Sequence, residues 1–164
     1  MNNLPPVRVS LTDSEIPNSA WEAWIPAGGA RKLRRALTPD ECTALERRRD
    51  ELTPAVAGYA EQDLDRIIVA ITDMLGGYTS MRQTDDEAVA KLDSMRRVLA
   101  PFPAWAIEKA CSNIQINGVW RDGKFDKRWP PNDAEVIDAI RSHVRLYEHQ
   151  HRSAIALLSA ELAE

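Results

Sequence analysis

The chain has 164 residues, a hydrophobic fraction of 44% and a formal net charge of −4. This length fits one domain of ordinary size with a real hydrophobic core. The negative net charge argues against a whole-domain electrostatic grip on nucleic acid, but it is compatible with a local basic patch. No stretch approaches the roughly 18 apolar residues of a membrane span, and the first residues have no signal-peptide pattern. We therefore expect a cytoplasmic protein that does not enter membranes.

Residues 1–37 differ in composition from the rest of the chain. They are rich in asparagine, proline and serine, which favour turns and disorder, and the pattern predicts a flexible arm. Trp21, Trp24 and Ile25 lie within this arm. They either fold back onto the helical body, which we favour, or anchor a partner. The basic run at residues 31–35 is typical of a solvated linker.

From residue 38 onward the sequence signals are helical. Thr38-Pro39-Asp40-Glu41 combines a capping box with proline at the first helical position. Thr84 to Glu87 forms a second capping box, and Asn132 is a helix cap before Asp133-Ala134-Glu135. Apolar residues then recur at helical spacing, and glycine or proline closes each pattern. The predicted helices run from 38 to about 52, from about 62 to 76, from 84 to about 99, from about 103 to 117 and from 133 to 164.

The last predicted helix carries an apolar stripe along its whole length. With no glycine or proline at 133–164, the helix would reach roughly 45 Å, which exceeds the width of a domain of this size. We expect its second half, residues 148–164, to project and to need a partner, and folding back onto the N-terminal arm is an equally weighted alternative. The candidate partner contacts on this stripe are Tyr147, His151, Leu158 and Leu162.

The predicted fold class is therefore all-α. We expect a compact bundle of four to five helices at residues 38–164, with its core at about 62–147, a long C-terminal helix and a poorly ordered N-terminal arm. No β-strand is expected.

The sequence contains few groups that could converge in an active site. The three histidines lie on the last helix, where positions 149 and 151 point to different faces and cannot chelate one ion together. Cys42 and Cys111 fall within helical patterns and are interpreted as reduced apolar residues. The paired carboxylates sit in first helical turns, where the helix dipole explains them. We expect no catalysis, no cofactor and no metal site.

The most unusual segment is the predicted loop at residues 118–131. Basic and aromatic residues alternate there, as in surfaces that track and stack on single-stranded nucleic acid. Asp122 and Asp126 offset two of the four cations. We favour a structural interpretation, in which the aromatics attach the loop to the core and the cations are solvated. The candidate nucleic-acid contacts are Trp120, Arg121, Lys124, Lys127, Arg128 and Trp129.

Residues from about Leu64 to Ile140 resemble the helical domain of phage-type replicative helicase loaders. The matching parts are the apolar helix Ile67 to Leu75, the helix Ala88 to Leu99, the A-xx-A-xxx-I pattern ending at Ile114, and the aromatic-proline turn with its acidic helix start, Lys127-Arg128-Trp129-Pro130-Pro131-Asn132-Asp133-Ala134-Glu135-Val136. The last of these is similar to the family's F-P-P-x-x-x-E-I signature.

The resemblance implies a non-enzymatic phage or prophage adaptor that binds a hexameric replicative helicase and helps to load it at an origin. In the family, a tail after the helical domain contacts the helicase. By position, that role would here belong to the helix beyond Tyr147.

Two further hypotheses stay open. One is a DNA-binding phage regulator or packaging module that holds single-stranded or duplex DNA through residues 118–131. The other is a self-assembling protein in which the apolar stripe at residues 137–162 pairs with its own copy as a homodimer.

Overall fold

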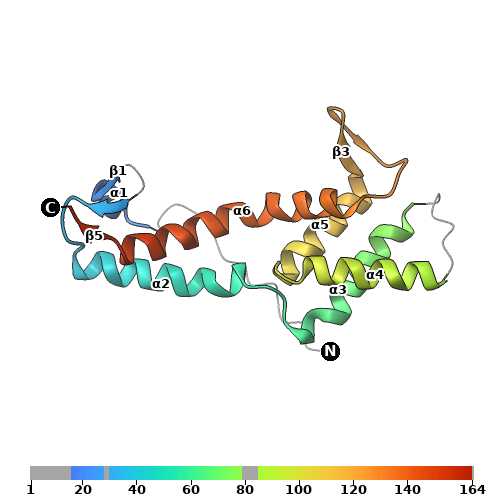
Figure 1. Cartoon of the computed structure of the whole chain (residues 1–164), viewed down its shortest axis with the longest axis horizontal. Helices are drawn as coiled ribbons and strands as arrows, with labels where there is room; N and C mark the ends of the chain where they lie inside the picture. The colour runs from blue at the N-terminus through green and yellow to red at the C-terminus, as the bar shows by residue number, and fades with distance from the viewer. Residues whose placement is uncertain (1–15, 28–29, 79–84, 164) are drawn as a thin grey trace. The chain divides into compact units, whose positions relative to one another are not determined.

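The computed structural model describes residues 16–27, 30–78 and 85–163. The chain forms two compact units (Figure 1). Of the described residues, those up to Val56 and those from Arg145 onward form the terminal unit, and those between Ala57 and Val144 form the central unit. The longest helix, α6 (Asp133–Leu158), contributes its first half to the central unit and its second half to the terminal unit. Most of the described residues are helical, as predicted, but two small sheets are also present.

The helices of the central unit follow the predicted order. After the short 3₁₀ helix η1 (Glu61–Asp63) come α3 (Leu64–Gly76), α4 (Asp85–Leu99), α5 (Ala104–Asn117) and the first half of α6. Helix α3 packs against α5, and Ile67, Ile71 and Met74 of α3 are fully buried. They share one apolar cluster with Ile107 and Ile114 of α5. The predicted ends at Gly76-Gly77 and at Asn117-Gly118 are confirmed.

In the terminal unit, residues 18–27 and 30–33 are folded in place of the predicted flexible arm. They form α1 (Asn18–Glu22) and the antiparallel strands β1 (Trp24–Ala27) and β2 (Ala30–Leu33). The physical reason is burial: Ala20, Ala23 and Leu33 lie in an apolar cluster with Leu45, Ala154 and Leu157. Residues 1–15 of the predicted arm lie outside the described residues, as does Thr84 of the second capping box.

Helix α2 (Pro39–Val56) begins at the predicted capping box. The backbone N–H of Glu41 donates to Thr38 Oγ1 at 3.2 Å, and the Glu41 carboxylate accepts from the Thr38 N–H at 2.8 Å. Arg35 adds a bidentate ion pair to the same carboxylate, with both distances at 2.8 Å. The helix passes through Pro54 and ends at Val56 rather than near Leu52, because Ala55 of the last turn is buried.

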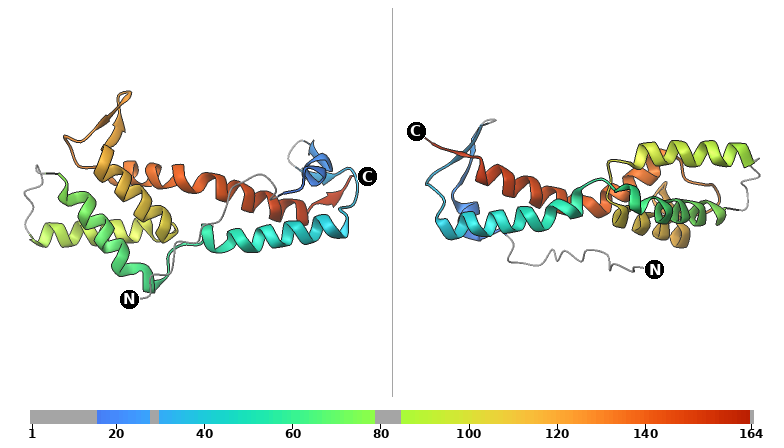
Figure 2. Two further views of the ribbon diagram at one scale, coloured as in Figure 1. Left: turned by 180° about the vertical axis from the view of Figure 1, so that it is seen from behind. Right: turned by 90° about the horizontal axis from the view of Figure 1, so that it is seen from below.

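The second half of α6 packs within the terminal unit in place of the predicted projection. Ala154, Ala156 and Leu157 are buried, and Arg48 of α2 donates to Gln150 at 3.1 Å. Figures 1 and 2 draw α2 alongside this half of α6. The helix ends at Leu158, and strand β5 (Glu161–Leu162) then joins β2 in parallel register. The alternative that the sequence left open, folding back onto the N-terminal segment, is the one found.

Candidate functional site

Residues 119–126 of the central unit form a β-hairpin where the sequence analysis expected a loop. Strand β3 (Val119–Arg121) pairs antiparallel with β4 (Lys124–Asp126). Asp122 and Gly123 join the strands with φ of 50° and 77°, which is the backbone of a two-residue type I′ turn. Figure 2 (left) shows this hairpin standing away from α3 and α4.

Three aromatic side chains on and beside this hairpin are exposed to solvent. The exposed fractions are 62% for Trp120, 60% for Phe125 and 62% for Trp129. Trp120 and Phe125 are cross-strand partners, and their rings meet edge to face with centroids 5.0 Å apart. The favoured interpretation, in which these aromatics attach the segment to the core, was wrong. The rings of Trp120 and Phe125 share one face of the hairpin, which is exposed to solvent, whereas Val119 and Asp126 at its base are buried.

Arg121 fixes the hairpin to the start of α6. Its guanidinium donates to both carboxylate oxygens of Glu135, at 2.5 and 2.6 Å, and to the carbonyls of Trp129 and Pro130 at 3.2 and 3.1 Å. These hydrogen bonds lower the pKa of Glu135. Glu135 also completes the predicted cap with Asn132, whose Oδ1 accepts from the Glu135 N–H at 2.9 Å. Arg121 is therefore engaged within the chain.

Arg128 is engaged in the same way. Its guanidinium donates to the Asp126 carboxylate at 2.8 Å, and its backbone N–H donates to the same side chain at 2.8 Å. These bonds hold the pKa of Asp126, which is only 8% exposed, well below its usual range. Within the part of the chain that the structure describes, no ion pair involves Lys124 or Lys127, and both are exposed.

Gly118 closes the base of the hairpin in a conformation that only glycine adopts readily. Its φ is +82°, and a Cβ built there would lie 2.3 Å from the Asp126 carbonyl oxygen. Phe125, Glu135 and Gly118 were not among the predicted site residues. The signal that could have found the hairpin is Asp122-Gly123 between two three-residue segments of strand-forming character.

The predicted partner contacts on the last helix lie in the terminal unit and pack against their own chain. His151 is half-buried and lies 3.1 Å from the Thr53 hydroxyl, and its burial lowers its pKa. Leu158 packs against the cluster around Leu45, and Tyr147 is half-buried. Leu162 is 54% exposed but belongs to β5. The structure therefore does not bring these four residues together as a free stripe.

Comparison of the chain with protein-family models, with curated proteins and with solved structures gave no match. Among the helices of the described residues, none combines the length and the apolar character that crossing a membrane requires.

Proposed function

We propose that this protein is a non-catalytic phage or prophage adaptor of DNA replication that binds a hexameric replicative helicase and helps to load it. The observation that carries the binding role is the aromatic hairpin, defined as residues 118–131 with exposed Trp120, Phe125 and Trp129. Large aromatic side chains left in water are costly, and they are the residues that dominate protein interfaces.

The charges around the aromatic hairpin favour a protein partner over a nucleic acid. Arg121 and Arg128 would have to leave Glu135 and Asp126 in order to bind phosphate, and each of these pairs is bidentate. The paired arginines instead stiffen the hairpin, so that its aromatics lose little conformational freedom on docking. A rigid apolar surface with two of its four cations already paired suits a protein groove.

The identity of the partner rests on the resemblance of residues 64–140 to helicase loaders. The aromatic-proline turn that carries the resemblance, Trp129 to Pro131, belongs to the aromatic hairpin. We therefore place the helicase contact on the hairpin, and no longer on the stripe at Tyr147, His151, Leu158 and Leu162, because that stripe is used within the terminal unit.

A second candidate function, binding of single-stranded DNA, is favoured by Lys124 and Lys127. Both are exposed beside aromatic rings on which bases could stack. This function predicts an affinity that falls steeply with salt and weakens on charge reversal of the two lysines.

The two functions are separated by a capture experiment with the tagged chain and host lysate. We expect the chain to recover the replicative helicase, identified by mass spectrometry, and the Trp120→Ala/Trp129→Ala variant to lose it. Ile116→Ala is the matched control, since Ile116 is 64% exposed on α5 of the same unit. Recovery of salt-released nucleic acid without helicase would favour the second function, and equal recovery by all variants would exclude the hairpin as the contact.

A further inference from the structure

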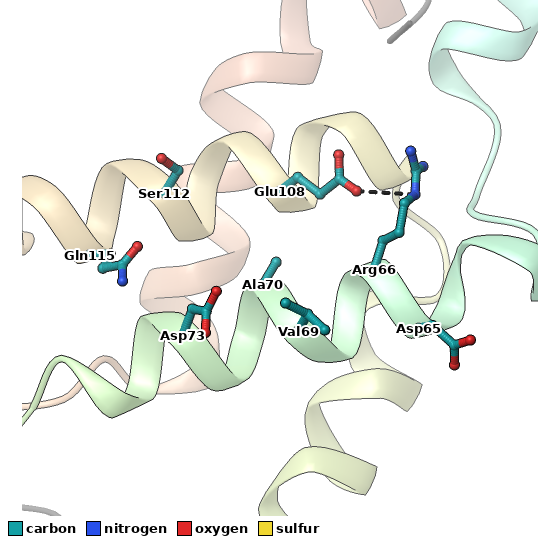
Figure 3. A pocket seen from close by; sticks show the side chains of 8 residues that line it. All are labelled: Asp65, Arg66, Val69, Ala70, Asp73, Glu108, Ser112 and Gln115. Atoms are coloured by element: carbon teal, nitrogen blue, oxygen red, sulfur yellow. Dashed lines mark ion pairs between the residues drawn. The ribbon is translucent and has the colours of Figure 1, made fainter. Parts of the chain in front are cut away.

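We draw no further inference here: the strongest candidate, the open groove of about 530 Å³ between α3 and α5 of the central unit (Figure 3), leaves Val69 exposed, and nothing in the structure shows what covers it.

Discussion

The guanidinium of Arg121 donates two hydrogen bonds to the carboxylate of Glu135, and this ion pair connects β3 to the first turn of α6. Both side chains are mostly buried, with about one fifth of their surface exposed. The same guanidinium holds the carbonyls of Trp129 and Pro130, so one side chain sets the path of the chain between β4 and α6. The exposed aromatics owe their fixed positions to this pair.

Replacing Arg121 with methionine should therefore loosen the aromatic hairpin and lower the free energy of unfolding by about 1–2 kcal/mol, since a charge-assisted pair is lost and Glu135 is left without its partner. Urea unfolding followed by circular dichroism measures this change. Arg141→Met is the control, because its pair with Asp138 is at 3.8 Å and exposed, and it should cost less than about 0.5 kcal/mol. Equal costs for the two variants would contradict the role assigned to Arg121.

Gly118→Ala should destabilise the central unit by about 2 kcal/mol or more. Its backbone lies at positive φ, and the added Cβ would collide with the Asp126 carbonyl. Gly76→Ala, at the last residue of α3, meets nothing within 4 Å and should be neutral or stabilise by up to about 1 kcal/mol. The melting temperatures of the two variants, measured by thermal unfolding, test whether the first substitution destabilises the protein and the second does not. A tolerated alanine at position 118 would mean that the hairpin base is not rigid.

Stability should fall as the pH is lowered, in two steps. Burial lowers the pKa values of His143 and His151, so the stability that their neutral forms contribute is complete above about pH 6.5 and is lost as the pH falls through the lowered values. Hydrogen bonds from arginine lower the pKa values of Glu41, Asp126 and Glu135. Their contribution is complete above about pH 4.5 and is lost below that, as they become protonated.

Urea midpoints measured between pH 8 and pH 3 follow both steps. The His143→Gln/His151→Gln variant should lose the upper step and keep the lower one. A midpoint that stays constant down to pH 3 would contradict the ion pairs described for these carboxylates.

The two cysteines should differ in reactivity. Cys111 is 1% exposed, and burial raises its pKa to about 12, so its thiolate is scarce at pH 8. Cys42 is half-buried on α2. A disulfide reagent should modify one thiol, that of Cys42, quickly in the native protein. The Cys42→Ser variant should lack this fast reaction. Rapid modification of both thiols would show that the core around Cys111 opens readily.

Local signals allowed the helices to be predicted from sequence. The caps at Thr38 and Asn132 form as expected, because a cap depends only on residues three apart. The ends at Gly76-Gly77 and Gly118 follow for the same reason. The hairpin had an equally local signal in Asp122-Gly123, but its strands are only three residues long and too short to show a periodicity of two.

Long-range pairing was not predictable in the same way. The apolar stripe of the last helix indicated that a partner was needed, but nothing in the pattern showed that Ala20, Leu33 and Leu45 of the same chain would provide it. The exposure of Trp120 and Trp129 also depends on the ion pair between Arg121 and Glu135, which are fourteen residues apart in the sequence. The sequence therefore predicted several of the candidate site residues. It did not predict which of them are exposed and which form ion pairs within the chain.

The most direct test of the proposed function is the affinity of the purified chain for a purified hexameric replicative helicase, measured for wild type and for Trp120→Ala/Trp129→Ala. We expect saturable binding by the wild type and a loss of at least about a hundredfold in the variant, as for two interface tryptophans, with an unchanged melting temperature. Ile116→Ala should bind as the wild type does. Unaltered affinity in the tryptophan variant, or no binding by the wild type, would contradict the proposal that the aromatic hairpin delivers a helicase.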